Sequence, residues 1–131
     1  IRFSMEVCSD TIYYNNKWPS DITVKINGIE ILTFTSPGNF GGRRGKYTPD
    51  YWPITSSQFG LLKTISVHND GVYLDNAFVH GNLVFDDLHI FDNDSISLEI
   101  GVKEDAEHKG GLSLFGKNFG DFNQAIIMVV S

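Results

Sequence analysis

The sequence predicts an all-β fold, an antiparallel β-sandwich of the jelly-roll type, and three observations support this prediction. Roughly eight to ten short segments carry apolar residues in alternation or in short runs, and turn residues separate them. No segment shows a convincing helical period. Several connections are long, which a simple up-and-down meander would not need.

The first third of the chain contains the clearest strand signals. Residues 1–8 alternate apolar and polar side chains, as a half-buried strand does, and the polar, aromatic residues 9–20 are expected to form a loop. Asn27-Gly28 then separates two apolar runs, and a type I′ turn needs positive φ at both of its central residues. We therefore expect a β-hairpin over residues 22–34.

The remaining strands are shorter. We expect them at residues 61–67, 72–75, 95–102 and 112–115, with one or two more around Gly81. Gly71 suits the turn after the first of them, because glycine adopts a left-handed conformation without steric cost. Residues 125–130, AIIMVV, form a continuous apolar run that is typical of a buried central strand.

The composition indicates one globular domain over residues 1–131. Hydrophobic residues make up 41% of the chain and charged residues 20%, which is enough to bury a core without disulfides. No apolar run approaches the roughly 20 residues that span a bilayer, and we expect no membrane contact. The first residues lack a signal-peptide core and start at Ile1, so we expect an excised part of a longer protein. The single cysteine, Cys8, favours a reducing, cytoplasmic location.

Charge and motif spacing argue against several function classes. The formal net charge of -6 disfavours direct nucleic-acid binding, which depends on Lys and Arg. The four histidines are dispersed without metal-ligand spacing, so we expect neither a metal nor another cofactor. Glu104, Asp105 and Glu107 lie close together in the sequence and could supply a general acid and base, but acids beside lysines usually form a solvated face. We expect no enzyme, and a sandwich-fold hydrolase remains an alternative.

Residues 36–53, SPGNFGGRRGKYTPDYWP, form the connection that most suggests function. It is far longer than a hairpin loop, and its aromatic content argues against plain disorder. A phosphate-binding loop is excluded, because Phe40 and Tyr47 stand where that motif needs Gly and Ser or Thr. Two roles are open for the guanidinium groups of Arg43 and Arg44. They donate hydrogen bonds to a ligand, or they form a solvated basic turn or pin the loop to nearby acids.

Aromatic residues gather in the predicted loops. They are Tyr13, Tyr14, Trp18, Tyr47, Tyr51 and Trp52. Exposed rings can stack on the apolar face of a sugar while a polar edge bonds its hydroxyls. The alternative for each ring is that it closes the end of a sandwich. Together with loop Arg, Asn and Asp residues, they predict a carbohydrate-type site.

Several stretches resemble the C-terminal domain of bacterial helix-turn-helix regulators of the ArsR-like, predicted type. They are SMEVCSD, YNNKWPSDITVKINGIEI, TSPGNFGGRRGKYTPDYWP, QFGLLKTISV, ISLEIGVKEDAEHKGGLSLFGKNFGDF and the closing β run, and they cover nearly the whole chain. The resemblance implies a β-sandwich effector domain, similar to sugar-binding jelly rolls, behind an N-terminal winged helix. DNA contact would come from that missing domain. The metal sensing that the ArsR label suggests is not carried over, because the chain lacks a Cys/His cluster.

We therefore expect the chain to be the ligand-sensing domain of a cytoplasmic transcriptional regulator. Its ligand is expected to be a small polar molecule, most simply a carbohydrate. If the site lies at an interface, the domain is expected to form a homodimer. The alternatives are a carbohydrate-binding module of a glycan-degrading enzyme and a dimerisation domain without ligand. The residues expected to stack on the ligand are Trp18, Tyr51 and Trp52. Those expected to hydrogen-bond it are Arg43, Arg44, Lys103 and Asn118, with Glu6 and Asp10 as further participants.

Overall fold

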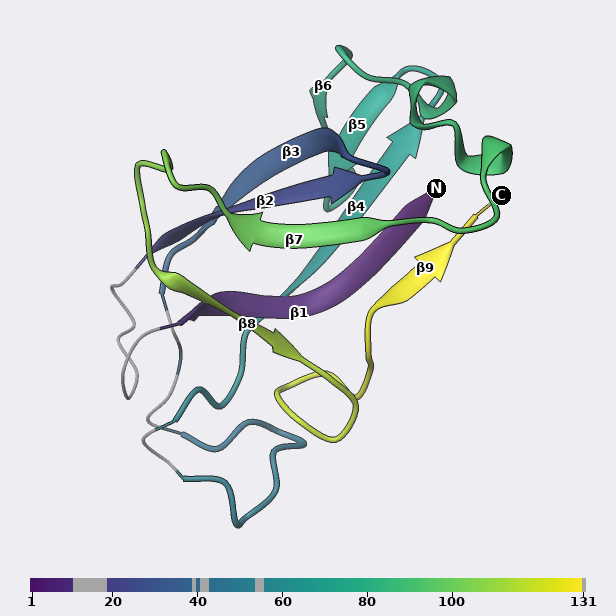
Figure 1. Cartoon of the computed structure of the whole chain (residues 1–131). Helices are drawn as coiled ribbons and strands as arrows, with labels where there is room; N and C mark the ends of the chain where they lie inside the picture. Colours follow the sequence, from purple (N-terminus) through teal and green to yellow (C-terminus); the bar gives the residue numbers. More distant parts are fainter. Residues whose placement is uncertain (11–18, 39, 41–42, 54–55, 131) are drawn as a thin grey trace.

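A computed structural model describes residues 1–10, 19–38, 40, 43–53 and 56–130, although the side chain of Asp10 is not among the features described (Figure 1). The strands are β1 (Arg2–Asp10), β2 (Ser20–Ile26), β3 (Ile29–Ser36), β4 (Leu61–His68), β5 (Gly71–Leu74), β6 (Ala77–His80), β7 (Leu98–Val102), β8 (Gly111–Phe115) and β9 (Ile127–Val129). Two short 3₁₀ helices, η1 (Phe85–Leu88) and η2 (Ile90–Asp92), follow β6.

Two antiparallel sheets form a sandwich-like fold, which confirms the all-β prediction. The larger sheet has the strand order β6-β5-β4-β1-β8, and the smaller has the order β3-β2-β7. β4 occupies one edge of β1, so β8 and β9 share the other edge: β8 pairs with Glu6–Asp10 and β9 with Arg2–Ser4. The jelly-roll topology itself remains a prediction.

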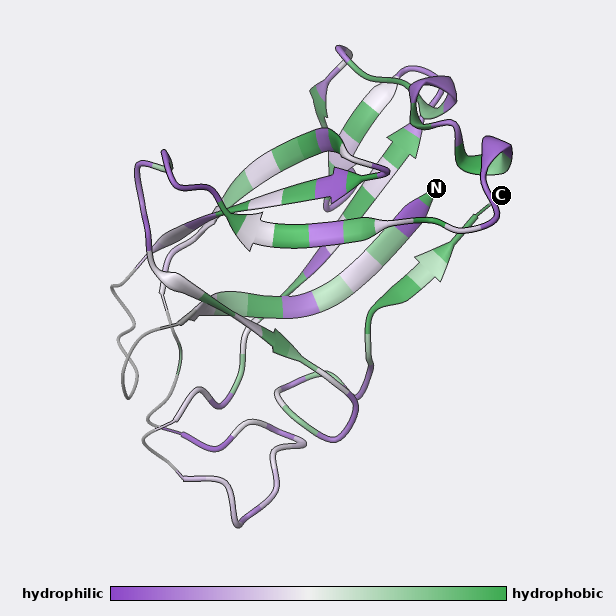
Figure 2. Ribbon diagram, viewed as in Figure 1, coloured by the Kyte–Doolittle hydropathy of each residue, from purple (hydrophilic) through white to green (hydrophobic). Residues whose placement is uncertain are grey.

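The core lies between the two sheets and follows from the alternation of the strands. In β2 the fully buried side chains are Ile22, Val24 and Ile26, and Phe3 and Met5 of β1 belong to the same cluster. Figure 2 shows the alternation of hydrophobic and hydrophilic residues along these strands. The period-two pattern therefore places one face of each strand in the core and leaves the other for solvent or for loops.

The predicted hairpin at residues 22–34 is confirmed. Asn27 and Gly28 have φ of 51° and 78°, the positive values that its tight turn requires. The Asn27 amide also donates a hydrogen bond to the carbonyl oxygen of Leu88, at 2.9 Å. The hairpin turn thereby holds the 3₁₀ segment against the sandwich.

One of the strand predictions is wrong. Residues 125–130 do not form a buried central strand, because β9 lies at the margin of the larger sheet with Ile127 and Val129 47% and 44% exposed. A continuous apolar run is typical of a strand buried on both faces, but it does not determine on which side of the strand partners lie. The prediction of one or two strands around Gly81 is met by one strand, β6, which ends directly before this residue. The residues after Gly81 form 3₁₀ turns that bury Leu88 and Ile90.

Within the described ranges, none of the helices has the length and apolar character that a membrane crossing requires.

Candidate functional site

A buried carboxylate, Glu6 of β1, anchors two loops on the larger sheet: the first loop, between β3 and β4, and the second loop, between β8 and β9. Glu6 is completely buried, and its oxygens accept hydrogen bonds from the backbone N–H groups of Gly60 (2.7 Å), Asp121 (3.1 and 2.9 Å) and Phe122 (3.1 Å). These bonds compensate the cost of removing the carboxylate from water. These contacts make Glu6 a support for the loops, and its expected contact with ligand stays a prediction.

A second buried polar cluster orders the insertion itself. The Gln58 amide is fully buried; its oxygen accepts from the N–H of Gly45 (3.2 Å) and its nitrogen donates to the carbonyl of Pro53 (2.8 Å). The Thr48 hydroxyl donates to the carbonyl of Gln58 and accepts from the N–H of Gly120, both at 2.8 Å. Sequence reasoning missed Gln58 and Thr48, because nothing local marks a loop residue as buried.

Arg43 joins the same two loops. Its guanidinium makes two hydrogen bonds to the carboxylate of Asp121, at 3.0 and 2.7 Å, and lies 3.7 Å from the centre of the Phe59 ring. Asp121 also accepts from the N–H of Lys46 at 3.0 Å. The hydrogen bonds from Arg43 lower the pKa of Asp121 below its ordinary value. These contacts are those of the pinning alternative, and a ligand-binding role for Arg43 stays a prediction.

Replacing Arg43 by glutamine is expected to destabilise the fold by about 1 kcal/mol at pH 7, since the pair is partly exposed. The folded-state pKa of Asp121 is lowered, so its contribution is complete above the ordinary value of 3.8 and disappears as the pH falls through the folded pKa. Urea titrations of both proteins from neutral pH downward measure this difference. A difference that persists unchanged in strong acid would contradict the ion pair as its source.

Arg44 braces the turn that carries Trp52. Its guanidinium donates to the carbonyl oxygens of Pro49 and Trp52, the latter at 3.0 Å, and lies 3.8 Å from a carboxylate oxygen of Asp50. The backbone N–H of Trp52 donates to the carbonyl of Pro49, at 3.0 Å. Arg44 therefore sets the position of a ring that the sequence predicted to stack on ligand.

The Trp52 ring borders a hollow of about 260 Å³, which we call the Trp52 hollow. Its lining residues are Trp52, Ser57, Ser113, Leu114, Phe115, Gly116 and Phe119. The indole N–H donates to the carbonyl of Ser57 at 3.1 Å, and Phe119 meets the ring edge-to-face with centroids 5.5 Å apart. Trp52 is nevertheless 37% exposed, so it is held on several sides and still open to solvent.

The other expected site residues are distributed over the molecule. Tyr51 is 78% exposed beside Trp52, and Asn118 lies in the second loop with φ of 73°, its N–H bonded to the Asn123 side chain. Trp18 and the side chain of Asp10 lie outside what the structure describes. The structure thus places Arg43, Arg44, Tyr51, Trp52 and Asn118 in the two loops that Glu6 of β1 supports.

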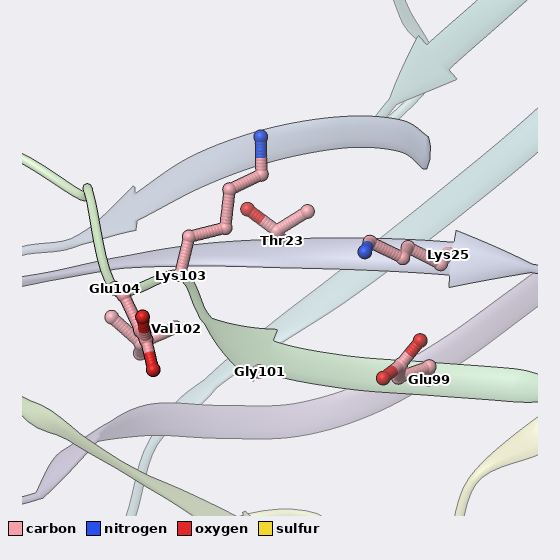
Figure 3. A pocket seen from close by; sticks show the side chains of 7 residues that line it. All are labelled: Thr23, Lys25, Glu99, Gly101, Val102, Lys103 and Glu104. Atoms are coloured by element: carbon pink, nitrogen blue, oxygen red, sulfur yellow. The ribbon is translucent and has the colours of Figure 1, made fainter. Parts of the chain in front are cut away.

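Lys103 does not join them. It follows β7 in the smaller sheet, forms an ion pair with Glu30, and lines a separate hollow of about 250 Å³. Figure 3 shows this hollow, with Lys25 and Glu99 at one end and Lys103 and Glu104 at the other. The side-chain hydrogen bond to Glu30 raises the pKa of Lys103 above its ordinary value.

Among the described residues, no group of three or more His, Cys, Asp or Glu side chains could hold a metal ion.

Comparisons of the chain with protein-family models, curated proteins and solved structures found no match in any of the three. The regulator family therefore stays a prediction, and the Trp52 hollow carries the functional interpretation.

Proposed function

We propose that the chain is a ligand-sensing domain that binds a carbohydrate in the Trp52 hollow. The observation that carries this proposal is the state of the indole ring. Its N–H is already bonded to Ser57, its edge-to-face partner is Phe119, and its main chain is braced by Arg44. A ring held in this way loses little conformational freedom when a sugar stacks on it, which favours affinity.

The lining of the hollow supports an uncharged ligand. None of its seven residues is charged, and a charged ligand would lose hydration there without gaining an opposite charge. The aromatic and aliphatic residues of the lining match the C–H face of a pyranose, and the same lining includes the polar residues Ser57 and Ser113. The nearby guanidinium groups of Arg43 and Arg44 are directed to Asp121 and to backbone carbonyls.

The regulatory part of the proposal rests on the sequence resemblance to bacterial helix-turn-helix regulators. A cytoplasmic sensor of this kind would contact DNA through an N-terminal domain, in agreement with the net charge of -6 on the present chain. Sugar would then act by binding more tightly to one arrangement of the DNA-binding domains than to another. Sequencing of the upstream gene region, followed by DNA binding of the longer protein with and without sugar, tests this part separately.

Replacing Trp52 by alanine is expected to abolish sugar binding while the fold persists. A thermal-shift screen against neutral mono- and oligosaccharides identifies the ligand. Sugar at about 100 times its dissociation constant should stabilise the wild-type chain by roughly 2.7 kcal/mol, or on the order of 5–15 °C. The same sugar should leave the melting temperature of Trp52→Ala unchanged, because the stacking face is lost.

Phe91→Ala is the matched control, since Phe91 is 77% exposed and lies on η2, outside the hollow. It should keep the full sugar response. No response of the wild-type chain to any neutral sugar, or an equal response in Trp52→Ala, would refute the assignment.

A further inference from the structure

The larger sheet carries a further cleft where β4, β1 and β9 lie next to one another, and we call it the Arg2 cleft. Its volume is about 240 Å³, and its lining residues are Arg2, Phe3, Ser4, Thr64, Asn76, Ile127 and Val129. In Figure 1 the start of β1 and β9 lie side by side near the C-terminal end of the chain. The Trp52 hollow borders β8 instead, which pairs with the other end of β1, so the two cavities are separate.

Strand alternation and register place the side chains of this cleft on one face of the sheet. The residue between Arg2 and Ser4 lies in the core, so these two side chains point to the face away from the core. Residues directly opposite one another in neighbouring strands share a face. Ser4 lies opposite Thr64 of β4 and Ile127 of β9, and Arg2 lies opposite Val129 of β9.

The polar part of the lining consists of donors without partners. Of the described lining residues, Arg2 alone is charged, and its guanidinium has no ion pair or hydrogen bond within the described ranges. The Thr64 hydroxyl and the Asn76 amide also lack hydrogen-bond partners there. Asp75 is committed elsewhere, because its carboxylate accepts from the Lys63 ammonium at 3.1 Å and from the N–H of Thr64 at 2.9 Å. The cleft therefore offers a positive charge that no carboxylate of the lining compensates.

The apolar part of the lining is aliphatic and exposed. Ile127 and Val129 both present their side chains to solvent, and Val129 stands opposite the cation. A phosphate ion has no apolar part for this surface, whereas an aliphatic carboxylate combines a charged end with an apolar end. The volume lies below the roughly 300–1,000 Å³ of pockets for drug-sized ligands, so the ligand should have only a few carbon atoms.

We infer that the Arg2 cleft binds a small aliphatic carboxylate. The planar guanidinium holds both carboxylate oxygens through parallel N–H···O bonds, for which arginine is better suited than lysine. Thr64 and Asn76 supply further donors, and the aliphatic chain lies along Ile127 and Val129. The net charge of -6 repels anions at a distance, so these local contacts carry the recognition. The inference goes beyond the sugar binding proposed above and does not depend on it.

Isothermal titration calorimetry at constant ionic strength tests the inference with four probes: acetate, butyrate, inorganic phosphate and 1-butanol. Butyrate should bind at least about fourfold more tightly than acetate, the gain from burying one of its two additional methylene groups. Phosphate should bind more weakly than butyrate, and uncharged 1-butanol should give no measurable heat of binding. In backbone amide NMR spectra, the shifts caused by butyrate should centre on Ser4, Thr64 and Asn76.

Two variants that remove one positive charge each separate the cleft from the general electrostatics of the chain. Arg2→Gln should raise the dissociation constant for butyrate at least about tenfold, since it removes a charged hydrogen-bond donor. Lys25→Gln is the matched control, because Lys25 lies on β2 of the smaller sheet and also lacks an ion pair in the part of the chain that the structure describes. It should keep butyrate binding within about twofold of the wild type.

Val129→Ala tests the apolar part of the cleft without changing its charge. Acetate should bind as before, and the preference for butyrate over acetate should disappear, because the aliphatic surface beside the guanidinium is shortened. This variant also keeps the inference testable if Arg2→Gln does not fold, which circular dichroism and melting temperature determine.

Four results would overturn the inference: no binding of butyrate to the wild type, equal loss of binding in Arg2→Gln and Lys25→Gln, phosphate or 1-butanol bound as tightly as butyrate, or an unchanged butyrate preference in Val129→Ala. Arg2→Gln should leave the sugar response measured by thermal shift in place. A failure of the carboxylate site is thereby distinguished from a failure of the sugar site.

Discussion

Replacing Glu6 by alanine is expected to destabilise the fold by about 3–5 kcal/mol, a large part of the stability of a domain of this size. The change removes the acceptor of three backbone N–H groups, those of Gly60, Asp121 and Phe122. These donors are held in the two loops that cover the sheet, where water does not readily replace a carboxylate. Urea unfolding measures the loss, provided that the slope of the transition is unchanged.

Glu6→Gln separates the charge of this side chain from its shape. The glutamine side chain keeps one acceptor oxygen, but its NH₂ group replaces the second oxygen and faces backbone donors that it cannot accept from. We therefore expect Glu6→Gln to lose about half as much unfolding free energy as Glu6→Ala. Glu99→Ala is the surface control, because Glu99 is an exposed glutamate on β7, and it should change stability by less than about 0.5 kcal/mol. A loss below about 1 kcal/mol in Glu6→Ala would mean that the loops do not depend on this anchor.

Local chemistry made parts of the fold predictable, and long-range pairing did not. The hairpin at Asn27-Gly28 follows from two adjacent residues, and the structure has it where the sequence predicts it. The position of β9 depends instead on where β1 still has a free edge, after β4 and β8 have paired with it. No property of residues 125–130 contains that information, and a central strand was therefore the wrong prediction.

The site shows the same limit at the level of single side chains. The sequence predicts a ligand-stacking role for Trp52 because an aromatic residue stands out in a long polar loop. Glu6 occupies a polar position of an alternating strand, which normally faces solvent, and only the loops packed over it make it a buried anchor. Phe119 lies in a second Gly-rich segment and completes the Trp52 hollow. Its aromatic ring in a polar loop is the one feature of the sequence that could have suggested a contact between the two loops.

Gly120→Ala is expected to cost about 2–4 kcal/mol, the second large effect on stability. Gly120 has φ of 76°, in the left-handed region that alanine enters only with strain. A Cβ at this position would also lie 2.3 and 2.5 Å from the two carboxylate oxygens of Glu6. Movement of the residue to relieve this contact would break its N–H bond to Thr48 and its acceptance of the Tyr47 N–H.

Gly116→Ala supplies the matched control in the same loop. A Cβ there meets no atom within 4 Å, so the change should be neutral or slightly stabilising, by up to about 1 kcal/mol, because alanine reduces the freedom of the unfolded chain. Urea unfolding of both variants therefore isolates the packing of the second loop against Glu6 from a general effect of losing glycine. Equal stability of Gly120→Ala and Gly116→Ala would show that this loop does not lie on the carboxylate, and the support for the Trp52 hollow would then have to be sought elsewhere.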